Sequence, residues 1–116
     1  MLSAKVLIAD ARGAQSVLWQ SDLVLVGRDS RCGVWIDHPM VSRQHCRIAQ
    51  RDGRFILEDL GTPNGIYVNQ QRVQGTVPLS HLDQIRCGPA HAQGPGLVPL
   101  PILTFQLIAD EDSATY

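Results

Sequence analysis

Short hydrophobic stretches recur along the chain, and Gly, Pro, Asn, Asp or Ser residues separate them. Within several stretches hydrophobic and polar residues alternate, as at Cys46 and Ile48 and again at Phe55 and Leu57. This period of two predicts β-strands with one face in the core and one face in water. No long segment shows the period of an α-helix. The pattern therefore predicts an all-β sandwich.

The same pattern places the expected strands along the sequence. They are Lys5–Ala9, Val17–Trp19, Leu23–Gly27, Val34–Ile36, His45–Gln50, Arg54–Asp59, Ile66–Asn69, Gln84–Cys87 and Ile102–Ile108. Asp52 and Gly53 separate two of them and are residue types of a tight hairpin turn, so the sheet is expected to be at least partly antiparallel. The segment from Gly88 to Pro101 is rich in Gly and Pro, which predicts a long loop before the last strand.

The length and composition indicate one domain. The chain has 116 residues, of which 44% are hydrophobic. A chain of this size can form a core without disulfides, metal ions or cofactors. We expect the domain to comprise residues 1–109. Residues 110–116 begin with three acidic residues and are expected to be a flexible tail or the start of a linker.

The three cysteines bear on the cellular compartment. Cys32, Cys46 and Cys87 are odd in number, far apart and without a paired spacing for zinc. They are expected to be reduced thiols, which favours a cytoplasmic location and no metal site. No hydrophobic run has the length of a secretory signal or a membrane span. We therefore expect a soluble, non-exported protein that does not insert into a membrane.

The charged residues favour an anionic ligand other than nucleic acid. Ten Lys and Arg residues face eleven Asp and Glu residues, and all but one of the basic residues are Arg. Arg binds carboxylate or phosphate through a planar fork of donors. Clustered basic residues with interleaved aromatic residues, which are typical of nucleic-acid binding, do not occur in the sequence.

Arg28 is the first candidate ligand-binding residue. It directly follows the expected strand end at Gly27, so its guanidinium can be held at an edge of the sandwich. There it can donate charge-assisted hydrogen bonds to phosphate oxygens. The alternative is a surface ion pair with Asp29 or Asp37, and such pairs contribute about 1 kcal/mol at most.

Ser42 and Arg43 lie on the next expected loop. The hydroxyl and backbone N–H of Ser42 can both donate to phosphate oxygens, which only accept hydrogen bonds. Alternatively, Ser42 satisfies polar groups of its own loop. Arg43 can add positive charge near the phosphate or the adjoining peptide, or it can remain solvated.

Thr62, Pro63, Asn64 and Gly65 have the composition of a tight turn. Pro63 presets φ, Asn64 tolerates an unusual backbone conformation, and Gly65 permits a positive φ. A turn is therefore predicted here. Without a ligand role, the side chain of Asn64 would only cap this turn.

Ser42 and His45 raise the hypothesis of a hydrolytic enzyme. A serine nucleophile also needs an orienting acid and an oxyanion-binding loop, and no Gly-x-Ser-x-Gly motif surrounds Ser42. Catalysis is therefore not predicted. His38 and His81 lie in expected loops or at loop edges and are predicted to face solvent, and the same holds for His91.

Four short motifs occur in a characteristic order. They are Gly27–Arg28, Ser42–His45, Asn64–Gly65 and Val68–Asn69. In this order and spacing the chain resembles the forkhead-associated (FHA) domain family over most of its length. The resemblance implies an FHA-type β-sandwich of about eleven strands in two mainly antiparallel sheets. It also implies ligand loops at one end that bind phosphothreonine peptides produced by a Ser/Thr kinase.

The resemblance also implies roles for individual residues. Arg28 and Ser42 would hold the phosphate with help from Arg43, and Asn64 would hydrogen-bond the peptide backbone beside the phosphothreonine. The remaining matched residues would support the binding loops. These supporting residues are Gly27, His45, Gly65 and Asn69.

Two positions depart from the family pattern. Pro63 stands where many members carry a Thr whose hydroxyl helps to hold the phosphate, and Thr62 is expected to compensate in part. Leu82 stands where the family often has Gly, so the turn before Asp83 is expected to differ in shape.

These observations predict a phosphothreonine-peptide-binding module without catalysis or cofactor, acting as a regulatory part of a larger protein or signalling pathway. The alternative is a phosphate-independent interaction or assembly domain of the same fold, which Pro63 favours. Removal of the Arg28 side chain distinguishes these two hypotheses. It should abolish partner binding by a phosphothreonine-binding module and leave binding by a phosphate-independent domain intact. The third hypothesis, a hydrolase built on Ser42 and His45, has the least support in the sequence.

Overall fold

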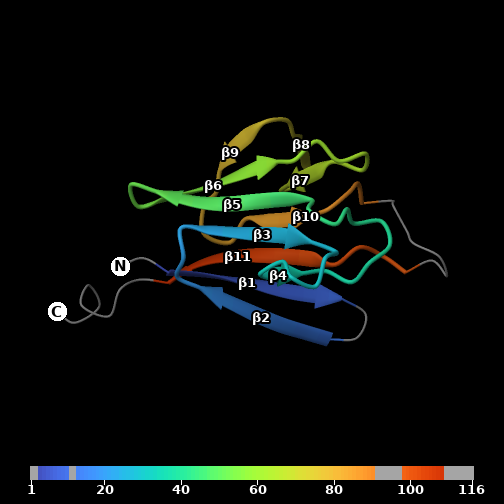
Figure 1. Cartoon of the computed structure of the whole chain (residues 1–116), viewed down its shortest axis with the longest axis horizontal. Helices are drawn as coiled ribbons and strands as arrows, with labels where there is room; N and C mark the ends of the chain where they lie inside the picture. The colour runs from blue at the N-terminus through green and yellow to red at the C-terminus, as the bar shows by residue number, and fades with distance from the viewer. Residues whose placement is uncertain (1–2, 11–12, 91–97, 109–116) are drawn as a thin grey trace.

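The computed structural model describes residues 3–10, 13–90 and 98–108. Eleven strands run through these residues and form two sheets (Figure 1). The strands are β1 (Ser3–Asp10), β2 (Gly13–Trp19), β3 (Leu23–Gly27), β4 (Val34–Trp35), β5 (Cys46–Arg51), β6 (Arg54–Asp59), β7 (Ile66–Val68), β8 (Gln71–Val73), β9 (Thr76–Pro78), β10 (Gln84–Arg86) and β11 (Ile102–Ile108). The predicted all-β sandwich is confirmed.

The two sheets are mainly antiparallel, as expected. The first sheet has six strands in the order β2-β1-β11-β10-β7-β8, and the second has five in the order β4-β3-β5-β6-β9. Only β3 and β4 pair in parallel among the described strands. We refer to them below as the six-stranded and the five-stranded sheet.

The hydrophobic pattern does not predict β8 and β9. Each has three residues, which is too short to display an alternation, and each lies at the edge of its sheet. Pro78 ends β9, where a residue without an N–H is tolerated at a sheet edge. Strand β2 begins at Gly13 instead of Val17, because its first four residues are exposed and show no hydrophobic pattern.

The predicted hairpin turn between β5 and β6 is confirmed. Asp52 and Gly53 have φ angles of 52° and 75°. Two successive positive φ values are those of a type I′ turn, whose twist matches that of the paired strands. The turn sets the register in which Arg51 pairs with Arg54 and Ile48 with Leu57.

The core lies between the two sheets. Inward-facing residues of both sheets, among them Val6, Ile48 and Leu57, are fully buried. Trp19, Phe55 and Phe105 form an aromatic cluster, with the Phe55 and Phe105 ring centroids 5.3 Å apart. Aromatic pairs at such separations add stability beyond the area they bury.

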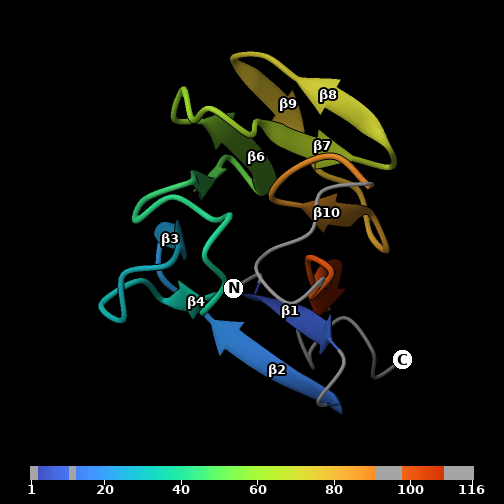
Figure 2. The same cartoon turned by 90° about the vertical axis from the view of Figure 1, so that its right-hand side faces the viewer.

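Three loops meet at one end of the sandwich. They connect β3 to β4, β4 to β5 and β6 to β7, and they lie at the right-hand end in Figure 1. Figure 2 views this end directly. The hairpin between β5 and β6 lies at the opposite end. The topology therefore gathers the segments 28–33, 36–45 and 60–65 into one surface.

Some predicted features lie outside the described residues. These are the acidic segment 110–116, His91 and the part of the Gly88–Pro101 loop at residues 91–97. Within the described residues, no helix has the length and hydrophobicity needed to cross a membrane.

Candidate functional site

The loops that carry Arg28 and Ser42 are joined through their backbones. The Arg28 N–H donates to the Ser42 carbonyl across 2.9 Å, and the Asp29 N–H donates to the Arg43 carbonyl across 3.2 Å. Gly27 lies directly against this second loop. A Cβ atom at Gly27 would lie 2.1 Å from the Arg43 carbonyl oxygen, so no larger residue fits. The close approach of the two backbones therefore requires glycine.

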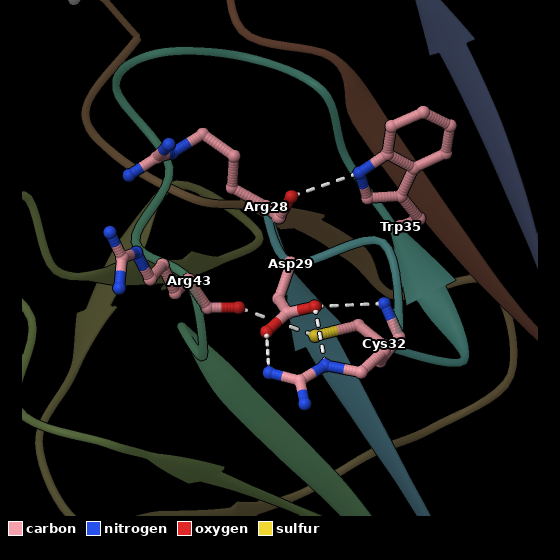
Figure 3. A network of polar contacts seen from close by, with 6 residues as sticks. Arg28, Asp29, Cys32, Trp35 and Arg43 are labelled. Carbon is pink, nitrogen blue, oxygen red and sulfur yellow. Dashed lines mark hydrogen bonds and ion pairs between the residues drawn. The ribbon is translucent and has the colours of Figure 1, made fainter.

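The side chain of Arg28 is exposed and anchored at its base. Its Nε donates to the Val41 carbonyl across 2.9 Å. Among the described residues Arg28 forms no ion pair. Arginine has five N–H donors, so the N–H groups at the tip of the guanidinium remain available to a ligand. In Figure 3 the guanidinium groups of Arg28 and Arg43 lie on the same side of the two loops.

The alternative for Arg28, a surface pair with Asp29 or Asp37, does not form among the described residues. Asp29 instead pairs with Arg31, whose Nη2 lies 2.7 Å from Asp29 Oδ2. The hydrogen bonds from Arg31 lower the pKa of Asp29 to about 2. The carboxylate of Asp29, next to Arg28 in the chain, is therefore paired with Arg31. The positive charge of Arg28 is not compensated by Asp29 and can attract an anionic ligand.

Two residues that the sequence pattern does not identify donate hydrogen bonds to the backbone carbonyls of Arg28 and Arg43. The indole N–H of Trp35 donates to the Arg28 carbonyl across 2.9 Å. The thiol of Cys32 donates to the Arg43 carbonyl across 3.3 Å. Figure 3 shows both contacts on the side of the loops away from the two guanidinium groups. An exposed tryptophan and a buried cysteine without a motif carry no sequence signal for this role.

His45 is fully buried and connects two loops. Its Nδ1 accepts a hydrogen bond from the Ser42 N–H at 3.1 Å, so in the neutral ring the proton is on Nε2. Nε2 lies within hydrogen-bond distance of the Gly65 carbonyl and of Thr62 Oγ1. Burial lowers the pKa of His45, although the bond to Gly65 opposes this shift. The ring is therefore held neutral.

This geometry refines the hypotheses for Ser42. Its backbone N–H is bonded to His45, so of the two groups considered for phosphate binding the hydroxyl is the one left for a ligand. The contact also runs from the backbone of Ser42 to the ring and does not involve the hydroxyl. It is therefore not the nucleophile-to-base hydrogen bond that a serine hydrolase requires.

The turn at residues 62–65 forms as predicted. The Gly65 N–H donates to the Thr62 carbonyl across 3.2 Å, and Gly65 has a φ of 74°. The Asn64 Nδ2 donates to the Met40 carbonyl across 2.7 Å. This bond places Asn64 beside the loop that contains Ser42. The amide retains a second N–H and an acceptor oxygen for a ligand.

The hydroxyl of Thr62 points toward His45, with Oγ1 3.0 Å from Nε2. Nε2 carries one proton, which it shares between the Gly65 carbonyl and Thr62 Oγ1, so the Thr62 hydroxyl keeps its own hydrogen for another acceptor. Pro63 is exposed and has neither hydroxyl nor N–H. Compensation by Thr62 for the missing family hydroxyl remains a prediction.

Asn69 lies away from these loops, at the turn between β7 and β8. Its Nδ2 donates to Asp83 Oδ1 across 2.8 Å, and its Oδ1 accepts from the Gln84 N–H across 3.0 Å. These two side-chain bonds hold the start of β10 and lie away from the turn at 62–65. Nearby Leu82 adopts a φ of 73°, so the backbone keeps a conformation that favours glycine.

His38 does not face solvent, which corrects the prediction. Its side chain is 4% exposed, its Nδ1 accepts from the Met40 N–H across 3.1 Å, and its Nε2 lies 3.0 Å from the Val98 carbonyl. His38 therefore shapes the loop whose Met40 carbonyl binds Asn64. His81 is exposed, as predicted. Among the described residues no cluster of metal-ligating side chains occurs.

Comparison with known proteins identifies the family. The family model of the FHA domain matches residues 24–88, which is more than half of the chain. The chain belongs to the FHA domain family. This FHA domain is 33% identical over 92 residues to the ABC transporter ATP-binding/permease protein Rv1747 of Mycobacterium tuberculosis, a match that covers 79% of the chain and 10% of that protein.

A second relative is the oxoglutarate dehydrogenase inhibitor of Corynebacterium diphtheriae. It is 36% identical to the FHA domain over 62 residues, which cover 53% of the chain and 43% of the inhibitor. The chain thus spans less than half of the length of these two relatives.

Solved structures share the fold. The crystal structure of Mycobacterium tuberculosis Rv1747 FHA-1 is 26% identical, with a TM-score of 0.65 over 91% of this chain and 98% of that chain. Mycobacterium tuberculosis EmbR in complex with a low-affinity phosphopeptide is 24% identical, with a TM-score of 0.71 over 91% of this chain and 25% of EmbR. The FHA family is a phosphopeptide-binding interaction module.

Proposed function

We propose that this FHA domain binds a phosphothreonine-containing segment of a partner protein that a Ser/Thr kinase has phosphorylated. The main support is the guanidinium of Arg28. It is anchored to the Val41 carbonyl and lies on the same side of the loops as Arg43. Arg28 and the hydroxyl of Ser42 hold the phosphate, Arg43 adds charge, and Asn64 holds the peptide backbone.

The binding energy comes mainly from the phosphate. A phosphate carries nearly two negative charges and forms charge-assisted hydrogen bonds with arginine. A short peptide on loop tips forms a small interface, so the dissociation constant is expected to be about 1 μM, or about −8 kcal/mol. The affinity falls as salt increases, because both partners are exposed to solvent. A slot for the threonine methyl near Asn64 disfavours serine by about 1 to 3 kcal/mol.

The domain acts without catalysis or cofactor, in the cytoplasm, as a regulatory part of a larger protein. We propose residues 1–109 as its extent. The contact between the Ser42 backbone and the neutral ring of His45 supports a bracing role for this histidine over a catalytic one. The free thiols of Cys32, Cys46 and Cys87 support a reducing compartment.

The test is fluorescence polarisation with a degenerate phosphothreonine peptide library and with matched phosphoserine and unphosphorylated libraries. Arg28→Ala is the diagnostic variant. Arg54→Ala is its matched control, because Arg54 is an exposed arginine on the hairpin at the opposite end. Saturable binding that requires phosphothreonine, is lost in Arg28→Ala and persists in Arg54→Ala supports the proposal.

Binding of a partner without phosphate dependence would support the second candidate, a phosphate-independent interaction domain. The exposed Pro63, which offers no donor to a phosphate, is the observation that favours it. In that case Arg28→Ala leaves partner binding intact.

A further inference from the structure

Arg72 lies against Gly65, the residue that follows Asn64 in the chain. It belongs to β8 and stands opposite Tyr67 of β7. Its guanidinium covers Gly65, since a Cβ atom at Gly65 would lie 2.9 Å from Arg72 Nε and 3.1 Å from its Cζ. Arg72 is exposed and forms no hydrogen bond or ion pair with the side chains of the described residues. A free guanidinium therefore sits next to the residue proposed to hold the peptide.

Arg86 approaches the same place from β10. Its Nε donates to the Gly88 carbonyl across 2.9 Å, and its Cζ lies 5.8 Å from the centre of the Tyr67 ring. Gly88 in turn packs beside Asn64, because a Cβ atom at Gly88 would lie 3.6 Å from the Asn64 Cβ. The cation–π contact and the hydrogen bond hold the Arg86 side chain in position. Its remaining donors are thus presented near Asn64.

The face of the sheet that carries both arginines has a positive charge. Arg72, Tyr67 and Arg86 stand opposite one another on β8, β7 and β10, so they share the outer face of the six-stranded sheet. The register places the following residues on the same face: Gln84, Ile102, Thr104, Gln106, Lys5, Leu7, Ala9, Ala14, Ser16 and Leu18. None of these described residues is a carboxylate. This face is complementary to an anion.

We propose that Arg72 and Arg86 bind a second anionic side chain of the phosphothreonine segment, close to the position held by Asn64. The domain then selects segments in which a carboxylate or a second phosphate flanks the phosphothreonine. An extended peptide advances about 3.3 Å per residue, so a neighbour within a few positions reaches from Asn64 to these arginines. This inference rests on the proposed phosphothreonine binding. It adds to that function a preference for an anionic residue near the phosphothreonine.

The test compares phosphothreonine peptides in which one flanking position at a time carries Ala, Glu or phosphoserine. Each is titrated by fluorescence polarisation against the wild type, Arg72→Ala, Arg72→Glu and the control Arg54→Ala. The quantity measured is the ratio of affinities for the anionic and the Ala peptide at the best position. We expect a ratio of up to about 5 for Glu, as for an exposed ion pair, and about 10 for phosphoserine.

Arg72→Ala is expected to lower this ratio toward 1, because only Arg86 then remains to attract the anion. Arg72→Glu is expected to lower the ratio further, and Arg54→Ala to retain it. The relative size of the Glu and phosphoserine ratios identifies which anion the site selects. A wild type without a preference for anionic peptides, or a preference that is undiminished in Arg72→Ala, would overturn the inference while phosphothreonine binding stands. Failure of the wild type to bind any phosphothreonine peptide would overturn both.

Discussion

The backbone N–H of Ser42 donates a hydrogen bond to Nδ1 of the fully buried His45, across 3.1 Å. The other ring nitrogen reaches Gly65 and Thr62 on the loop between β6 and β7. One neutral imidazole therefore connects the loop that carries the serine with the turn that carries Asn64.

Replacing His45 should destabilise the fold and weaken ligand binding together. His45→Ala leaves a cavity and removes the buried partner of the Ser42 N–H, which should reduce the free energy of unfolding by about 3 kcal/mol. Urea unfolding measures this change, and phosphopeptide titration measures binding. His81→Ala, at an exposed histidine, is the control and should have little effect. A stable His45→Ala domain with full affinity would contradict the bracing role.

Stability should fall as the solution is acidified through the histidine range. Burial lowers the pKa of folded His45 below its ordinary value of 6.5. Between the two values the unfolded chain binds more protons, so the free energy of unfolding decreases as pH falls from 6.5 to the folded pKa. The slope attributable to one group is at most about 1.4 kcal/mol per pH unit.

Two measurements check this dependence on pH. Urea titrations at about pH 7.5 and about pH 5.5 should show the loss of stability. An NMR titration of the imidazole resonances should place the pKa of His45 below its ordinary value of 6.5. A His45 ring that titrates at or above 6.5 would refute the prediction.

Gly27→Ala should be far more damaging than an alanine substitution at a second loop glycine. The new Cβ would lie 2.1 Å from the Arg43 carbonyl and would force the two ligand loops apart. We expect a loss of about 3 kcal/mol and a loss of phosphopeptide binding. Gly61 has a φ of 75° with no atom near its Cβ position, so Gly61→Ala should lose only about 1 to 2 kcal/mol through strain. Equal effects of the two substitutions in urea unfolding would disprove the steric explanation.

Pro63→Thr should strengthen phosphopeptide binding. The new hydroxyl can donate one hydrogen bond to the phosphate, which contributes about 1 kcal/mol, or a factor of about 5 in affinity. Pro63→Val has a similar shape without the hydroxyl and is the control. Calorimetric titration with one phosphothreonine peptide measures both. The prediction fails if Val and Thr change the affinity equally.

Leu82→Gly should stabilise the domain without altering ligand binding. Leu82 has a φ of 73°, a conformation that costs a residue with a Cβ about 1 to 2 kcal/mol, and its side chain is 55% exposed. We expect a gain of about 1 kcal/mol in urea unfolding, because glycine removes the strain but loses some chain entropy. Leu82→Ala keeps the Cβ and should bring no gain, so a stabilised Leu82→Ala would contradict the argument.

Much of the fold was predictable because it is encoded locally. Alternation of hydrophobic residues marks β5 and β6, and the residue types Asp52 and Gly53 mark the turn between them. The edge strands β8 and β9 were not predictable, since three residues cannot display a period. The burial of His38 was missed for a related reason, because its partners Met40 and Val98 are brought together by folding.

By itself, the sequence determined the β class, the order of the binding motifs and the residue types that can hold a phosphate, since these depend on local periodicity and on side-chain chemistry. The tertiary structure alone decided which donors are already engaged. It bonds the Ser42 N–H to His45, pairs Asp29 with Arg31 and sets Arg72 against Gly65. Hydrogen bonding and charge neutralisation depend on distances between residues far apart in sequence, and only the packed sheets set those distances.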